Sequence, residues 1–205
     1  MLAIVPVRGR EGKTRLDGFL APEERARLVE VMLADVIAAC AGAETVARVL
    51  VVTPEPDIVP DGVETLVDEG AGHEEAVAYA LMDARARDGA VVVMGDCPRA
   101  TPDAVDRLVA AAEPVALVPS RDGGMNALAL AEPDAVDPVF GVPRAADETA
   151  RRARMRALEP AVLEDDALAF DVDEPADVWE LREHGEGTRT HEALALILPP
   201  TGGLR

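Results

Sequence analysis

The chain has 205 residues, of which 49% are hydrophobic, and its formal net charge is −19. This length and apolar content fit one domain that buries a sizeable core. With 39 acidic against 20 basic residues and 2% aromatic residues, the chain lacks the cations and rings that nucleic acid requires. We also expect a cytoplasmic protein with no membrane partner, because no apolar run approaches the roughly 20 residues that span a bilayer and no signal-peptide pattern opens the sequence.

Strands and helices alternate along the first half of the chain. A buried strand at 3–7 runs into a loop rich in glycine and arginine, and Pro22 then opens a helix that ends near Gly42. The elements expected next are strands at 46–53 and 63–67, a helix from about 73 to 87 and a strongly apolar strand at 90–94.

The second half continues the alternation as far as residue 184. The expected elements are a helix at 101–112, strands at 115–119 and 127–131, a helix at 146–157, a short strand at 170–173 and a helix from Pro175. This order predicts a single-domain, doubly wound α/β fold of Rossmann-like type with a mostly parallel sheet. Residues 185–205 show no clear pattern, so we divide the chain into a domain at 1–184 and a tail of unknown role.

Lys13 is the only lysine in the chain, whereas the other basic residues are all arginine. It follows the first predicted strand, inside VPVRGREGKTRL. A compact ammonium at such a position suits a phosphate group better than a flat guanidinium does. The alternative is chance retention on a solvated loop.

Aspartates follow other predicted strands. Asp96 ends the strand at 90–94, and Asp171 and Asp173 would face the same side of an extended segment. Because ligands of open α/β sheets bind beyond the carboxyl ends of the strands, these acids and Lys13 are expected to meet. Carboxylate oxygens suit Mg²⁺, which we therefore expect as the cofactor. The alternative for each aspartate is a turn or a helix cap.

Five segments occur in a recognisable order over residues 1–181: VPVRGREGKTRL, GDCP, RDGGMNALAL, VFG and FDVDEPADV. Together they resemble the 2-phospho-L-lactate guanylyltransferases of coenzyme F(420) biosynthesis, within the group that includes molybdenum cofactor guanylyltransferase. The resemblance implies a nucleotide-diphospho-sugar transferase-like fold. It also implies an enzyme that transfers GMP from GTP to the phosphate of 2-phospho-L-lactate or phosphoenolpyruvate and releases pyrophosphate.

The same resemblance assigns roles to individual residues. The implied groups are Lys13, Arg15 and Asp96 for catalysis; Arg8, Gly12, Lys13 and Arg15 for the nucleotide; Gly124, Asn126, Gly141 and Arg144 for the acceptor; and Asp96, Asp171 and Asp173 for the metal. The expected partners are GTP and a small phosphorylated acid, and a homodimer is left open.

The chain departs from the family pattern at several positions. Glu74 replaces an asparagine, Met125 a threonine and Arg144 a serine. Arg144 either clamps the acceptor with its guanidinium or lies on the surface. The departures leave two alternatives to the transferase: a diverged, non-catalytic nucleotide-binding protein of this fold, or a transferase that acts on a molybdopterin or sugar phosphate.

Overall fold

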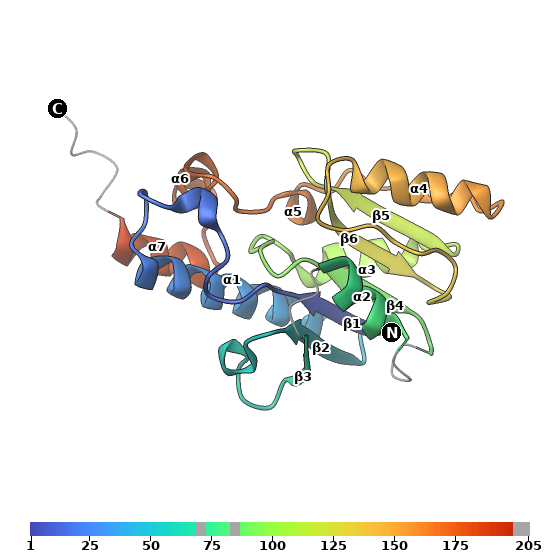
Figure 1. Ribbon diagram of the computed structural model, residues 1–205, viewed down its shortest axis with the longest axis horizontal. Helices are drawn as coiled ribbons and strands as arrows, with labels where there is room; N and C mark the ends of the chain where they lie inside the picture. Colours follow the sequence, from blue (N-terminus) through green and yellow to red (C-terminus); the bar gives the residue numbers. More distant parts are fainter. Residues whose placement is uncertain (69–72, 83–86, 199–205) are drawn as a thin grey trace.

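The computed structural model describes residues 1–68, 73–82 and 87–198 (Figure 1). Within these residues, the strands form one seven-stranded sheet in the order β3-β2-β1-β4-β6-β5-β7. Their bounds are β1 Leu2–Pro6, β2 Arg48–Thr53, β3 Glu64–Val67, β4 Ala90–Val93, β5 Val115–Pro119, β6 Met125–Leu130 and β7 Ala161–Val162. Strands β1, β4 and β6 are buried over their full length, as expected for the centre of a sheet covered on both faces. The predicted α/β class is confirmed.

The sheet is mostly parallel, and β6 is the exception. It pairs antiparallel with both β4 and β5, whereas β1 pairs parallel with β2 and β4. The reason is the short connection from β5, in which Gly123 has a φ of +90° and its N–H donates to the carbonyl of Ser120 at 3.0 Å. Such a short turn joins antiparallel strands only, since a parallel crossover needs a dozen or more residues.

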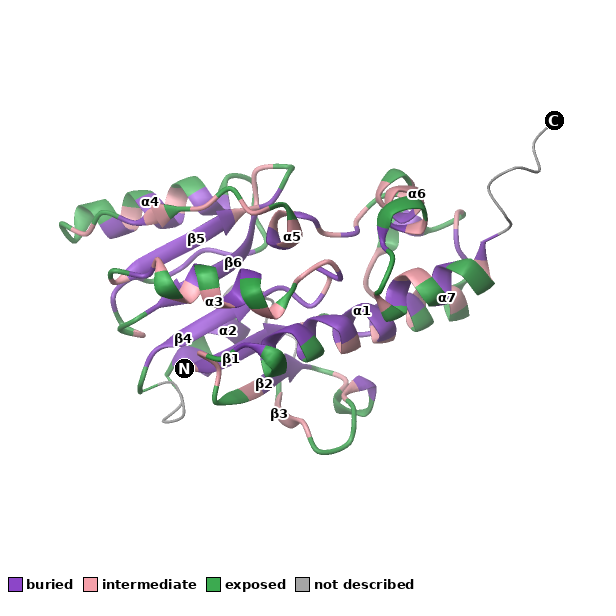
Figure 2. Cartoon of the chain, turned by 180° about the vertical axis from the view of Figure 1, so that it is seen from behind, coloured by how far each residue is buried: buried purple, intermediate pink, exposed green. Residues whose placement is uncertain are grey.

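Helices cover the sheet on both sides. Their bounds are α1 Pro22–Gly42, α2 His73–Leu81, α3 Pro102–Ala110, α4 Ala145–Met155, α5 Asp166–Ala169, α6 Pro175–His184 and α7 Arg189–Ile197. Helices α1 and α3 lie in front of the sheet in Figure 2, whereas α2 lies in front of it in Figure 1. Helix α2 ends at Leu81, before the predicted end, and the following residues 83–86 lie outside the described part.

The prediction of a strand at 170–173 is wrong. Among the described residues, this segment has no ladder partner. It follows α5 directly, and the edge beside β5 is taken by β7, which pairs with Ala116 and Leu117. The segment is joined to the sheet by hydrogen bonds outside any ladder: the Val172 N–H donates to the carbonyl of Asp96 at 3.2 Å, and the Asn126 side chain donates to Asp171 at 3.2 Å. Neither α5 nor β7 was predicted, because each is too short to show a period.

The residues that follow α6 fold back on the domain as far as 198. Helix α7 packs against α1 and α6, and Figure 1 shows it beside α1. Asp35 of α1 is buried and accepts hydrogen bonds from the N–H groups of Arg189 and Thr190, both at 2.9 Å. Its carboxylate thus caps the N-terminus of α7. The division of the chain at residue 184 stays a prediction.

No helix in the described ranges combines the length and apolar character that a membrane crossing requires.

Candidate active site

A pocket of about 420 Å³ opens at the carboxyl ends of β1 and β4. The rest of its lining comes from the loop after β1, helix α1, the turn between β5 and β6 with the first residues of β6, residues 141–143 and the segment that contains Asp171 and Asp173. Its size and its position at the strand ends are typical of a ligand site in an open α/β sheet.

Acidic residues outside the pocket hold the loop after β1 in place. Gly9 has a φ of +93°, and a Cβ at this position would lie 2.5 Å from a carboxylate oxygen of Glu55. Glu55 also accepts the Arg10 N–H at 3.1 Å, and the Arg10 guanidinium pairs with Glu30 at 2.8 Å and Asp57 at 2.6 Å. Arg10 therefore holds the loop in place, whereas the predicted nucleotide residues Arg8, Gly12, Lys13 and Arg15 are among those that line the pocket.

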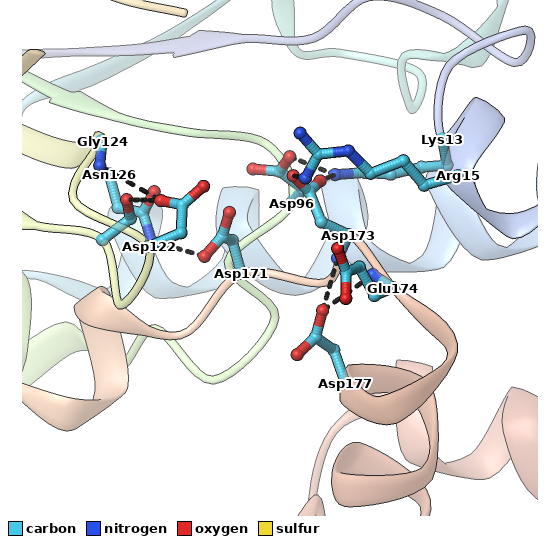
Figure 3. Close-up of polar contacts among 11 residues, drawn as sticks. Lys13, Arg15, Asp96, Asp122, Gly124, Asn126, Asp171, Asp173, Glu174 and Asp177 are labelled. Atoms are coloured by element: carbon cyan, nitrogen blue, oxygen red, sulfur yellow. Dashed lines mark hydrogen bonds and ion pairs between the residues drawn. The ribbon is translucent and has the colours of Figure 1, made fainter. Parts of the chain in front are cut away.

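Lys13 directly precedes a short 3₁₀ helix (Thr14–Leu16). The backbone of Lys13 itself has the left-handed conformation, with φ 60° and ψ 41°. This conformation costs a residue with a side chain about 1–2 kcal/mol. The side chain is only 11% exposed, and its Nζ donates to Asp173 at 2.7 Å and to Asp96 (Figure 3). Burial lowers the pKa of Lys13, but the two carboxylates outweigh it and raise the pKa above its ordinary value. The ammonium is held charged inside the pocket.

Three carboxylates gather around this ammonium. Oxygen atoms of Asp96, Asp171 and Asp173 lie within 4.8 Å of one another. Burial and the nearby Asp96 charge raise the pKa of the Asp171 carboxyl to about 6, so the cluster lacks full compensation for its negative charge. Opposite ligands of Mg²⁺ are roughly 4.2 Å apart, given bonds of about 2.1 Å. The donor set therefore fits a hard divalent cation with small side-chain adjustments.

Neighbouring groups fix the orientation of the acids. Arg15 pairs with the second oxygen of Asp173 at 3.1 Å, and Asp177 accepts the Asp173 N–H at 3.0 Å. The buried Asn126 side chain donates to Asp171 at 3.2 Å and to the carbonyl of Ala169 at 3.1 Å. Asn126, predicted to contact the acceptor, thus also positions a predicted metal ligand. Asp177 was not predicted, although its place three residues after Glu174 is that of a capping-box acid.

The turn between β5 and β6 contributes Asp122, which sequence reasoning missed. Its carboxylate accepts hydrogen bonds from the Ser120 hydroxyl and, at 3.1 Å, from the Gly124 N–H. These bonds lower the pKa of Asp122 below its ordinary value. The sequence offers a signal for Asp122, because an aspartate before two glycines often forms a turn by accepting a hydrogen bond from the backbone N–H two residues later.

The predicted acceptor residues lie at different depths. Gly141 lines the pocket with a φ of +73°, and a Cβ there would lie 3.5 Å from Nη2 of Arg8. Arg8 is exposed and makes no hydrogen bond or ion pair with other described residues. Arg144 is 81% exposed, lies outside the pocket lining and pairs with Asp147 at 2.9 Å. Its contact with the acceptor stays a prediction.

The structure describes the side chain at one of the two other departures from the family pattern, Met125, but not at Glu74. Met125 is buried and lines the pocket beside Asn126. Glu74 lies in α2, but its side chain is outside the described part of the chain.

The comparison with known families agrees with this geometry. Residues 1–198 match the family described as "Guanylyl transferase CofC like". The chain belongs to this family. It is therefore a guanylyltransferase, and the pocket that contains Lys13 is its candidate active site.

Curated relatives of this guanylyltransferase act on different acceptors, according to their names. It is 39% identical to a phosphoenolpyruvate guanylyltransferase of Sphaerobacter thermophilus, over 89% of this chain and 93% of that one. It is 34% identical to a 2-phospho-L-lactate guanylyltransferase of Natrialba magadii, over 92% and 86% of the two chains. A 3-phospho-D-glycerate guanylyltransferase of Phenylobacterium zucineum is also 34% identical, over 94% of each chain.

Solved structures confirm the fold of this guanylyltransferase. A candidate nucleotide-diphospho-sugar transferase from Desulfovibrio desulfuricans G20 aligns with a TM-score of 0.72 at 21% identity, covering 94% of this chain and 93% of the other. A CMP:2-keto-3-deoxy-manno-octonic acid synthetase in complex with CTP aligns at 0.63 with 17% identity, covering 89% and 96%. The nucleotide-diphospho-sugar transferase-like fold predicted from the sequence is thus confirmed.

Proposed function

We propose that this guanylyltransferase transfers GMP from GTP to the phosphate of a small phosphorylated acid in the pocket described above. A phosphate oxygen of the acid attacks the α-phosphorus of GTP, the bond to the bridging oxygen breaks, and pyrophosphate leaves. Such a transfer depends on in-line positioning and on neutralisation of charge on the phosphorus oxygens. The observation that carries the proposal is the buried ammonium of Lys13, which pairs with Asp96 and Asp173 at the carboxyl ends of β1 and β4.

The roles of the remaining groups follow from their places in the pocket. Arg8, Gly12, Lys13 and Arg15 lie on the loop after β1, where we assign them to the phosphates of GTP. Asp96, Asp171 and Asp173 would hold Mg²⁺, which, when bound, neutralises phosphate charge and orients the leaving group. Without nucleotide, Lys13 offsets part of the charge of these acids; with nucleotide, its ammonium is placed to contact the triphosphate.

For the acceptor, we propose 2-phospho-L-lactate or phosphoenolpyruvate, and the named relatives add 3-phospho-D-glycerate as a third acid to test. All three carry one carboxylate and one phosphate, so they require cations on the acceptor side. We assign Gly124, Asn126 and Gly141, which line the pocket, to that side, together with Arg144, which follows the lining residue Pro143. The product would enter coenzyme F(420) biosynthesis in the cytoplasm. The partners of the enzyme would be GTP and the acid, and homodimerisation stays a prediction.

The test is an assay of pyrophosphate release with GTP, Mg²⁺ and each of the three acids in turn. We expect release that depends on one acid and on GTP rather than ATP or CTP, and that falls sharply in Lys13→Ala. GTP binding without pyrophosphate release for every acid would favour the non-catalytic alternative. Release with a molybdopterin or sugar phosphate alone would favour the other alternative.

A further inference from the structure

Four side chains from separate segments form a cluster beside the pocket, which we call the Phe170 clamp: Arg99, Arg121, Phe170 and Glu180. The guanidinium carbon of Arg99 lies 4.0 Å from the centre of the Phe170 ring, and that of Arg121 lies 4.8 Å from it. Glu180 accepts from Arg99 at 2.7 Å and from Arg121 with both oxygens at 2.9 Å. One carboxylate therefore joins two arginines that contact one aromatic ring.

Each member of the clamp belongs to a segment that carries part of the site. Arg99 lies three residues after Asp96, and Arg121 lies in the turn that contains Asp122. Phe170 directly precedes Asp171. Glu180 comes from α6, whose N-terminus follows Asp173 (Figure 1, Figure 3). The clamp thus connects all three segments that supply acids to the pocket.

Backbone hydrogen bonds join the same segments. The Arg121 N–H donates to the carbonyl of Ala169 at 3.3 Å, and the Val172 N–H donates to the carbonyl of Asp96 at 3.2 Å. These two bonds flank Phe170 and Asp171, and Asn126 also holds the Asp171 side chain, whereas Phe170 itself is fixed by packing. The fully buried Phe170 ring supplies that packing.

The charges make Glu180 the central member of the clamp. Two guanidinium groups that contact one ring repel each other, and Glu180 offsets this repulsion. Burial would raise the pKa of the Glu180 carboxyl, but the hydrogen bonds from Arg121 and Arg99 lower it below its ordinary value. Removal of this one charge leaves the repulsion between the two arginines without its offset, and so loosens their contact with the ring.

We propose that Glu180 is a positioning residue for guanylyl transfer. By holding the two arginines on the ring, its carboxylate fixes Asp171 and Asp173 against Asp96. Glu180 itself does not line the pocket, so it acts through these neighbours. The inference rests on the proposed metal site, whose ligands it concerns. It predicts that loss of the charge weakens binding of a divalent cation before any chemistry takes place.

The test compares Glu180→Gln with Glu64→Gln by calorimetric titration of Mn²⁺ into the nucleotide-free protein. Glu64 is a matched control, because it is 35% exposed against 36% for Glu180 and accepts two hydrogen bonds from Arg48, both at 2.7 Å. Glu64 lies on β3, outside the pocket lining. We expect Glu180→Gln to weaken Mn²⁺ binding by about 10-fold, as is typical of residues that orient metal ligands, and Glu64→Gln to leave it unchanged.

A second variant and a thermal denaturation curve keep the test decisive. Arg121→Gln alters a more exposed member of the clamp and should also weaken Mn²⁺ binding while the protein stays folded. Wild-type Mn²⁺ affinity in both clamp variants would overturn the positioning role and leave the proposed metal site intact. If the wild-type protein itself bound no Mn²⁺, the proposed metal site would fail, and the inference would fall with it.

Discussion

Nζ of Lys13 lies 2.7 Å from a carboxylate oxygen of Asp173, although the two residues are 160 positions apart in the sequence. The contact joins the loop after β1 to the segment that leads into α6. A buried ion pair of this kind is weak evidence for stability, because desolvation of both charges offsets much of their attraction. Its position in the pocket indicates a role in function instead.

Replacement of Lys13 tests this role directly. We expect Lys13→Ala to lower kcat by about 10²–10³, the usual effect of losing one preorganised group that stabilises developing charge. Lys13→Arg should restore only part of the activity, because a guanidinium differs from an ammonium in reach and hydration. Steady-state pyrophosphate release gives the rates, and circular dichroism checks the fold. Wild-type turnover in Lys13→Ala would contradict the proposed role.

The backbone of Lys13 gives a second prediction, which concerns stability. Lys13→Gly and Lys13→Ala both remove the ammonium, but only glycine adopts φ 60° without a steric penalty. The free energy of unfolding should therefore be about 1 kcal/mol larger for Lys13→Gly than for Lys13→Ala. Urea denaturation of the two variants measures the difference. An equal or larger value for the alanine variant would show that the loop relaxes once the side chain is lost.

A third prediction concerns the metal. Asp96→Asn removes a charged ligand, so it should weaken GTP binding in the presence of Mg²⁺ far more than binding without it. Calorimetric titrations of GTP with and without Mg²⁺ separate the two effects. The exposed Asp61, which does not line the pocket, provides the control Asp61→Asn. Equal losses under both conditions would reduce Asp96 to a structural role.

The sequence predicts those parts of this molecule that depend on local pattern. The apolar run of β1, the proline at the start of α1 and the acids that end strands are all local, and the strand-end rule then places Lys13 near Asp96. The direction of β6 depends on the short connection from β5, which the spacing of the expected strands at 115–119 and 127–131 indicates although their hydrophobic pattern does not.

Other features depend on tertiary structure alone. The extended segment at 170–173 resembles a strand in sequence, but a strand exists only if a partner offers a free edge. The contact of Glu180 with Arg99 and Arg121 joins residues up to 81 positions apart, and no spacing in the sequence indicates it. Such contacts follow from the fold and cannot be predicted before it.

The last prediction separates the acceptor from the nucleotide and uses Arg144. Its ion pair with Asp147 is exposed and therefore weak, so the guanidinium is able to turn toward an acid bound beside Pro143, which lines the pocket. If Arg144 binds the acid, Arg144→Ser should raise the KM for the acid by roughly 10- to 100-fold, equivalent to about 1.5–3 kcal/mol for a hydrogen bond to a charged group, and leave the KM for GTP unchanged. The control Asp147→Asn frees the guanidinium and should not raise either KM. An unchanged KM for the acid in Arg144→Ser would place Arg144 on the surface, whereas a defect specific to GTP would show that the Gly141 loop faces the nucleotide.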